Sequence, residues 1–204
     1  MADPLNQLIP RDSLAGQVIE GWVRLHNGHS VPVAGKHAYY DTYSDILVLN
    51  KGVHEPLEEF CFQEIIKCLP SKPIMLELGA FWGHYSMWLQ KIRPKAQLHL
   101  VEPEIDNIEA GKINFEKNGY QGIFIQAFVG HNEFNVDDYL AKNNIKKLDI
   151  LHSDIQGFEL EMLEDSIKSL EQKLIDYVFL STHSQELHIK CIDFLGALNY
   201  KIIV

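Results

Sequence analysis

The sequence has few cysteines, no long apolar run and no excess of positive charge, and each absence excludes a class of protein. Its three cysteines, Cys61, Cys68 and Cys191, lack metal-type spacing, and their odd number does not suit a disulfide framework. We interpret them as buried small hydrophobic residues in a reducing compartment. No window approaches the roughly 18 apolar residues of a membrane span, and the first residues do not resemble a signal peptide. We expect a soluble, cytoplasmic protein.

The charge balance argues against a nucleic acid or an anionic membrane as the main partner. Eighteen lysines and arginines face 28 aspartates and glutamates, so the formal net charge is −10 at pH 7. Repulsion between this charge and a polyanion opposes encounter. A small molecule is therefore the expected partner.

The pattern of apolar residues predicts an α/β fold with an N-terminal extension, and 204 residues suffice for one such domain. Residues 1–54 are irregular, with strand-like runs such as 46–50, and we interpret them as a cap or lid. Residues 55–204 form the predicted core. A helix is expected over 56–69. Its apolar spacing places five residues on one side: Leu57, Phe60, Cys61, Ile65 and Leu69.

Predicted strands and helices alternate along the core. The strands are 74–78, 97–102, 122–128, 148–153, 176–181 and 201–204. The helices are 85–92, 106–118, 136–143, 159–170 and 186–198. This alternation implies a mostly parallel, doubly wound sheet that binds ligands beyond the carboxyl ends of its strands. The last strand ends the sequence, so its exposed edge implies a missing continuation or a covering chain, such as a second copy in a homo-oligomer.

A turn containing two glycines, Gly79 and Gly83, follows the first core strand. Glu77 is an acid inside that apolar strand, and Glu102 ends the next one, where a carboxylate can bind both hydroxyls of a ribose. Either a dinucleotide or an adenosine-containing cofactor fits this pattern. The glycines lack the G-x-G-x-x-G spacing that a pyrophosphate needs. A sulfonium cofactor with an amino-acid tail fits better, and a purely structural turn is the alternative.

Four motifs, LELGAFWGHYS, VEPEIDN, HSDIQGFELEML and STHS, resemble the FkbM family of S-adenosylmethionine-dependent methyltransferases over roughly residue 55 to the C-terminus. The resemblance implies a Rossmann-like methyltransferase sheet with S-adenosylmethionine as cofactor. The implied cofactor residues are Glu77, Gly79, Ala80 and Gly83 at the methionine end, Glu102 at the ribose, and Ala127 and Phe128 at the adenine.

Polar residues follow the fourth and fifth core strands. Asp154 matches the family's D-x-Q/E-G-x-E motif, which implies a substrate-facing or metal-binding carboxylate, whereas capping of the next helix is the alternative. Glu159 is interpreted as favouring the start of that helix. His183 follows the neighbouring strand, within expected reach of Asp154. We predict that this pair performs proton chemistry, with His183 as the base.

Residues of the cap and of the glycine turn are candidate substrate contacts: Tyr39, Tyr40, Glu55 and His84. Polar aromatic side chains in a lid fit a hydroxylated substrate, although ordinary surface tyrosines give the same pattern. Seven other histidines lack metal-ligand spacing and receive no role: His26, His29, His37, His54, His99, His131 and His188.

The predicted function is S-adenosylmethionine-dependent O-methylation of a small molecule such as a sugar or a polyketide-type alcohol, with Mg²⁺ or Mn²⁺ on Asp154 as a possible addition. Three alternatives stay open. One is a nicotinamide oxidoreductase, which the glycine spacing disfavours. Another is a hydrolase built from Ser153, Asp154 and His183, which lacks the G-x-S-x-G turn. The third is a non-catalytic cofactor-binding module of a larger assembly.

Overall fold

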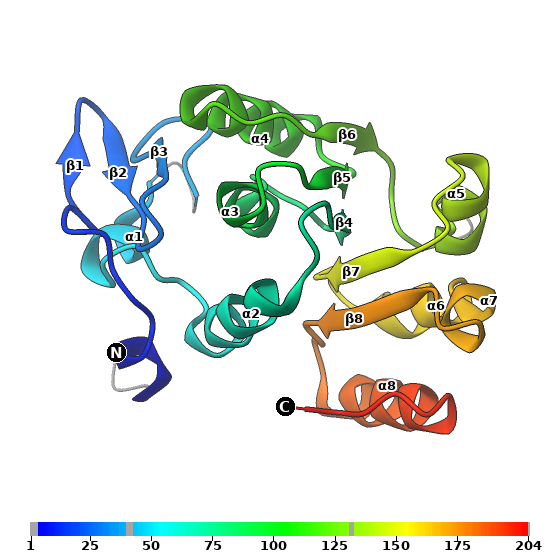
Figure 1. Cartoon of the computed structure of the whole chain (residues 1–204). Helices are drawn as coiled ribbons and strands as arrows, with labels where there is room; N and C mark the ends of the chain where they lie inside the picture. The colour runs from blue at the N-terminus through cyan, green and yellow to red at the C-terminus, as the bar shows by residue number, and fades with distance from the viewer. Residues whose placement is uncertain (1–3, 40–42, 131–132, 204) are drawn as a thin grey trace. The chain divides into compact units, whose positions relative to one another are not determined.

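Figure 1 shows the computed structural model of the protein, which describes residues 4–39, 43–130 and 133–203. The chain forms two compact units, and it passes between them several times. Unit 1 comprises Met1–Lys72, Phe81–Ala96 and Glu104–Gly122. Unit 2 comprises Pro73–Ala80, Gln97–Pro103 and Ile123–Val204. The predicted domain boundary between residues 54 and 55 falls inside unit 1 and stays a prediction.

A five-stranded sheet forms the centre of unit 2. Its strands are β4 (Ile74–Leu78), β5 (Gln97–Glu102), β6 (Ile123–Gln126), β7 (Leu148–Ser153) and β8 (Ile175–Leu180). Their order is β6-β5-β4-β7-β8, and all neighbouring pairs are parallel. Every residue of β7 is buried, because a central parallel strand is covered on both faces. The α/β class with a parallel sheet is therefore confirmed.

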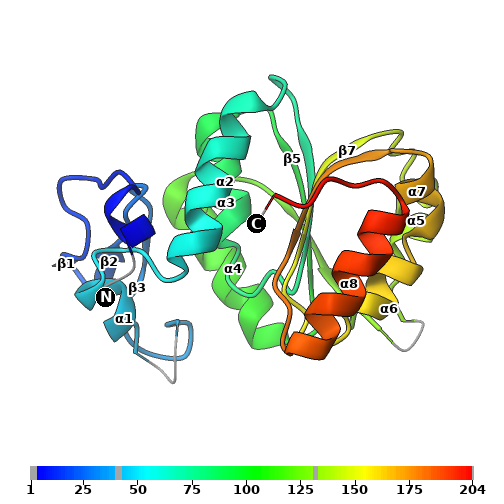
Figure 2. The same cartoon turned by 90° about the horizontal axis from the view of Figure 1, so that it is seen from below.

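Four helices complete unit 2: α5 (Val136–Lys142), α6 (Glu159–Glu164), α7 (Ile167–Glu171) and α8 (Gln185–Ala197). The helix α6 lies beside α8 (Figure 2), and α5 lies beside α7. The single helix predicted over 159–170 is wrong, since the chain breaks at Asp165 and Ser166. The Ser166 hydroxyl donates a hydrogen bond of 2.6 Å to the Met162 carbonyl, and such bonding to the preceding turn weakens a helix locally.

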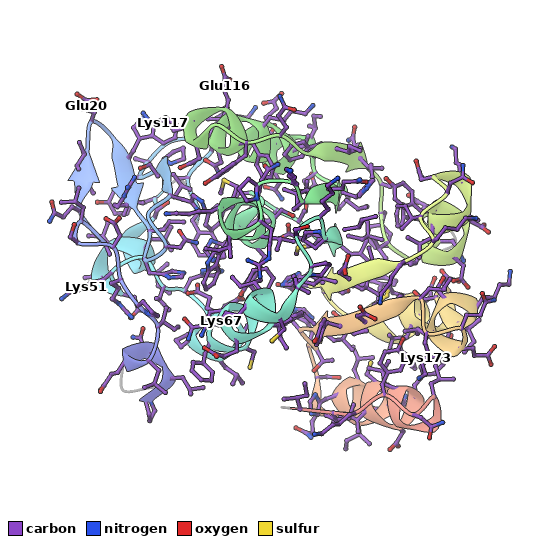
Figure 3. All side chains as sticks on the ribbon, viewed as in Figure 1. Glu20, Lys51, Lys67, Glu116, Lys117 and Lys173 are labelled. Atoms are coloured by element: carbon purple, nitrogen blue, oxygen red, sulfur yellow. The ribbon has the colours of Figure 1, made fainter. Side chains whose placement is uncertain are left out.

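The strand predicted over residues 201–204 is also wrong for its described part. Residues 201–203 have no strand pairing, and Val204 lies outside the described residues. The Tyr200 hydroxyl instead donates to the Ile175 carbonyl at 2.8 Å. The Nζ atom of Lys173, a residue labelled in Figure 3, lies 4.0 Å from the centroid of the Tyr200 ring. These contacts hold the chain after α8 against the start of β8 through one side chain, without a backbone ladder.

Unit 1 combines a small antiparallel sheet with helices. Its strands are β1 (Val18–Ile19), β2 (Trp22–Arg24) and β3 (Ser30–Pro32), in that order. Its helices are the 3-10 helix η1 (Pro4–Gln7), α1 (Asp45–Leu49), α2 (Pro56–Cys68), α3 (His84–Ile92) and α4 (Ile105–Asn118). Lys117 of α4, labelled in Figure 3, places its Nζ 4.7 Å from the centroid of the Trp22 ring. No helix among the described residues combines the length and apolarity of a membrane span.

Two predictions for unit 1 are wrong. Residues 46–49 of the strand-like run lie in α1, and Asn50 caps the end of this helix. The Asp45 carboxylate accepts a hydrogen bond from the Ile46 amide at 2.9 Å, and Leu49 is 66% exposed. An acid in the first turn favours a helix. The predicted apolar side of α2 includes Leu57, which is 47% exposed. The buried residues of α2 are Glu59, Phe62, Gln63 and Ile66.

The cysteines were predicted to be buried, and the structure bears this out only in part. Cys191 is buried, Cys61 is half-buried and Cys68 is exposed. Cys68 ends α2 on the side opposite the residues that face the interior of unit 1, which explains its exposure. All three are free thiols.

Candidate functional site

The carboxyl ends of the parallel strands meet at one edge of the sheet of unit 2. Glu77 pairs with Leu100 of β5 and with His152 of β7. Glu77 and Glu102 are only 2% and 5% exposed. From β4, the chain first adds strands on one side of the sheet (β5 and β6) and then on the other side (β7 and β8). Ligands of such sheets bind at the point between β4 and β7 where this direction changes. The structure thus places both predicted acids at the edge where a cofactor binds in folds of this class.

The backbone around Gly79 leaves no room for a side chain at this position. Its φ is +68°, and an added Cβ would lie 1.9 Å from the Asp154 carbonyl oxygen. The Asp154 amide donates to the Leu78 carbonyl at 3.0 Å, while the amides of Gly79 and Ala80 donate to the Val101 carbonyl at 2.9 and 3.0 Å. The turn after β4 therefore packs against the turn after β7. This is a structural role, and the cofactor contacts of Gly79 and Ala80 stay predictions.

His183 lies between two carboxylates. Its Nε2 is 3.1 Å from Asp154 Oδ1, and its Nδ1 is 2.8 Å from Glu159 Oε1. The His183 and Asp154 side chains are 33% and 32% exposed, whereas Glu159 is fully buried. The structure thus brings Asp154 and His183 together, as their positions after neighbouring strands implied.

The chain positions these three side chains through its turns. The Ser181 amide donates to the Ser153 carbonyl at 3.0 Å, which extends the pairing of β7 and β8 to Ser181, two residues before His183. Gln156 and Gly157 have φ values of +55° and +109°, so the chain turns sharply after Asp154. The Gly157 amide then donates to Glu159 Oε1 at 3.1 Å. Glu159 is held in place from two sides.

Sequence reasoning missed the contact of Glu159 with His183. It treated Glu159 as an acid that favours a helix start, because that role needs no partner. The available signal was the second acid of the D-x-Q-G-x-E motif, five positions after Asp154. A sharp turn between the two acids lets them approach one imidazole from opposite sides.

The arrangement suits proton transfer. Glu159 accepts from the Nδ1–H of His183, which fixes the ring and leaves Nε2 as the atom that exchanges a proton. Nε2 faces Asp154 on the more exposed side. The site can therefore accept a proton from a hydroxyl and stabilise the resulting cation.

The residues predicted to contact adenine follow β6. The Ala127 amide donates to the Glu102 carbonyl at 3.4 Å. The ring of Phe128 packs edge-on against Phe158, with centroids 4.9 Å apart. Gly130 is needed beside them, because a Cβ there would lie 2.5 Å from the Phe158 ring. An apolar wall thus adjoins Glu102, and its contact with adenine stays a prediction.

The remaining predicted site residues belong to unit 1. Gly83 precedes α3 with φ +78°, and His84 is 3% exposed. The Tyr39 ring contacts those of His54, Phe81 and Trp82. Glu55 Oε2 accepts from the Tyr85 hydroxyl at 2.9 Å. Tyr40 lies outside the described residues, and the functional roles of the other four stay predictions.

Asp154 was also predicted as a metal ligand. Among the described residues it belongs to no group of three histidine, cysteine or acidic side chains whose ligand atoms converge. The structure therefore gives this metal assignment no support from geometry.

Comparison with known proteins agrees with this geometry. Residues 129–202 match the family model of the methyltransferase FkbM domain. No curated protein sequence matches the chain. A precorrin-6y C5,15-methyltransferase from Geobacter metallireducens GS-15 is similar in structure, with 16% identity, a TM-score of 0.51, and coverage of 69% of this chain and 71% of that chain.

The methyltransferase domain of METTL16 is similar too, with 12% identity, a TM-score of 0.52, and coverage of 72% of this chain and 74% of that chain. Identities this low show a shared fold alone. The matched family segment contains Asp154, Glu159 and His183. The resemblance to the FkbM methyltransferase family is therefore confirmed over residues 129–202, and the fold of the chain is that of the Rossmann-like methyltransferases.

Proposed function

We propose that the protein is an S-adenosylmethionine-dependent methyltransferase that acts on a hydroxyl of a small molecule, such as a sugar or a polyketide-type alcohol. The observation that carries this proposal is the His183 ring held between Asp154 and Glu159. A hydroxyl becomes a better nucleophile when it loses its proton, and imidazole is the side chain suited to accept it near neutral pH.

The described residues of unit 2 fit the cofactor that the sequence motifs imply. S-adenosylmethionine supplies a methyl group activated by a sulfonium centre. Glu77 would bind its ammonium group and Glu102 its ribose hydroxyls, and both carboxylates are nearly fully buried at neighbouring strand ends. Ala127 and Phe128 would provide the apolar surface for adenine.

Each member of the histidine site has a distinct role in this proposal. Glu159 positions the ring through Nδ1, and His183 accepts the proton at Nε2. Asp154 faces the substrate and stabilises the imidazolium. Alignment of acceptor and methyl donor can supply up to about 7–11 kcal/mol, whereas a general base contributes a factor of about 10² to 10⁴ in rate. The base therefore assists a reaction that depends mainly on positioning.

A methyl-transfer assay with labelled cofactor and a panel of hydroxyl substrates tests this function. His183→Ala should lower turnover by about 10² to 10⁴. The control is His188→Ala, which changes a histidine of α8 that contacts Thr182. Its turnover should stay close to that of the unchanged protein. Equal turnover of His183→Ala and the unchanged protein would reject the base assignment. Cofactor binding by calorimetry without transfer to any acceptor would identify a non-catalytic module.

The role of Mg²⁺ or Mn²⁺ on Asp154 needs a separate experiment. Turnover is measured after chelation and after each ion is returned alone. Recovery with Mg²⁺ or Mn²⁺ that is lost in Asp154→Asn supports an ion at this carboxylate, where it would lower the pKa of the acceptor hydroxyl. Unchanged turnover after chelation rejects it.

A further inference from the structure

Four ionisable side chains meet in the interior of unit 1: His26, His54, Glu59 and His84. His26 follows β2, Glu59 lies in the first turn of α2, and His84 begins α3. The exposed fractions of His26, Glu59 and His84 are 2%, 0% and 3%. Three segments far apart in sequence thus bring polar groups to a place that solvent barely reaches.

The distances between these groups fit a shared ion. Glu59 Oε2 is 3.0 Å from His26 Nε2, and Glu59 Oε1 is 3.6 Å from His84 Nε2. One ligand atom from each of the three residues lies within 4.8 Å of the other two. An ion bonded at about 2.0–2.2 Å separates its ligand atoms by about 3–4 Å. Only a small contraction is needed to surround one.

Hydrogen bonding leaves several of these atoms unexplained. His26 Nε2 and Glu59 Oε2 are close, yet among the described residues neither has a hydrogen-bond partner of acceptable geometry. Within that same part of the chain, both ring nitrogens of His84 also lack one. Buried polar atoms in folded proteins are almost always paired. An ion at the point where they converge supplies the missing partner to one atom of each residue.

His54 contacts only one of the two carboxylate oxygens of Glu59. Glu59 Oε1 accepts from the His54 amide at 3.0 Å and lies 2.7 Å from His54 Nδ1. These contacts satisfy Oε1 and leave Oε2 for a cation. Carboxylates that ligate a metal ion are usually held by hydrogen bonds from outer groups.

Aromatic rings surround the two histidine ligands and fix them in place. The Trp88 ring centroid is 4.6 Å from that of His26 and 5.9 Å from that of His84, while the Trp82 centroid is 5.1 Å from that of His84. Such an apolar shell strengthens metal–ligand interactions by excluding water.

We propose that His26, Glu59 and His84 form a binding site for a divalent transition-metal ion, with Zn²⁺ as the best-suited species. Two imidazole nitrogens and one carboxylate oxygen are a donor set that Zn²⁺ accepts with tetrahedral geometry. Mg²⁺ and Ca²⁺ prefer oxygen ligands alone. The ion joins the segment after β2 to α2 and α3. This site is separate from Asp154, and the proposal does not depend on methyl transfer.

Metal binding to the full chain tests the proposal directly. Protein freed of metal with a chelator is titrated calorimetrically with Zn²⁺ and with Mg²⁺, and bound zinc is counted by elemental analysis. We expect one zinc ion per chain and a higher thermal unfolding midpoint with Zn²⁺ than with Mg²⁺. Binding of less than one equivalent of zinc, or an equal response to Mg²⁺, would overturn the site.

Variants identify the ligands. His84→Gln and His26→Gln should each weaken zinc binding by more than about 10-fold. The matched control is His99→Gln, which changes a buried histidine of unit 2 that contacts Tyr139 and should leave zinc binding unchanged. Wild-type affinity in His84→Gln would contradict the assignment. If the ligand variants fail to fold, X-ray absorption of the zinc-loaded unchanged protein decides: two imidazole ligands support the site, and an oxygen-only shell rejects it.

Discussion

Gly79 and Glu159 show how single residues determine the carboxyl edge of the sheet in unit 2. Gly79 lets two turns approach until a side chain no longer fits, and Glu159 holds one nitrogen of His183 from a fully buried position. The proximity of Asp154 and His183 could be predicted, because parallel strands end at one edge. The contact of Glu159 could not, since it depends on positive φ values at Gln156 and Gly157, and the sequence does not reveal the direction in which such a turn leads.

Replacing Gly79 should be far more harmful than replacing another glycine with the same backbone angle. Gly79→Ala places a Cβ 1.9 Å from the Asp154 carbonyl and should lower the free energy of unfolding by about 3–5 kcal/mol. Gly119 has φ +77° and nothing within 4 Å of an added Cβ, so Gly119→Ala should cost about 1–2 kcal/mol. Urea denaturation of both variants measures the difference. Equal losses would show that the turns separate easily.

Glu159→Gln should impair His183 without removing it. The amide can still occupy the space beside Nδ1, but it lacks the negative charge that stabilises an imidazolium. We expect kcat to drop by a factor between about 10 and 10⁴. An unchanged kcat would show that Glu159 does not support His183 in the reaction.

The elements of unit 1 are linked by polar contacts that periodicity does not reveal. Asn118 of α4 bridges Ser30, accepting from its amide at 2.9 Å and donating to its carbonyl at 2.9 Å. Near it, His29 Nε2 contacts the Tyr120 hydroxyl at 3.1 Å. The buried face of α2 was mispredicted for a similar reason, because counting apolar residues overlooks a buried acid such as Glu59. Strands β4, β5 and β7 were located correctly, since continuous apolar runs indicate buried parallel strands.

The contact of β3 with α4 should weaken in acid. Burial, helped by the charge of Lys91, lowers the pKa of His29 from 6.5 to about 3. The unfolded chain therefore binds a proton that the folded chain does not, and stability present above pH 6.5 is lost as the pH falls toward 3. The loss is about 1.4 kcal/mol per pH unit.

Comparison of variants isolates this effect. At pH 7, His29→Gln should have a lower free energy of unfolding than the unchanged protein. Between pH 6.5 and pH 5, this difference in free energy should decrease by about 2 kcal/mol. Tyr120→Phe removes the hydroxyl partner and keeps the imidazole. The difference in free energy of unfolding between this variant and the unchanged protein should therefore change little over the same pH range. Urea unfolding at several pH values provides the data. If the difference in free energy of unfolding caused by His29→Gln does not depend on pH, the pKa of His29 is the same in the folded and the unfolded protein.

The whole molecule carries a formal net charge of −10 at pH 7, and this charge argues against nucleic acid as the main partner. We expect no retardation of RNA or DNA oligonucleotides in gel-shift assays at physiological salt, because repulsion between polyanions opposes binding. A positively charged protein of similar size serves as the control. Binding that weakens steeply with added salt would contradict this expectation and reveal a local basic surface.

The alternation of the chain between units 1 and 2 has a consequence for synthesis on the ribosome. The last segment of unit 1 ends at Gly122, whereas the first segment of unit 2 begins at Pro73 and its last segment begins at Ile123. When the last segment of unit 1 has emerged, β4 and β5 already exist without β7, their partner in the finished sheet. These two hydrophobic strands therefore stay incompletely paired until β7 has been synthesised. A translational pause soon after residue 122 would expose them to chaperones or to aggregation.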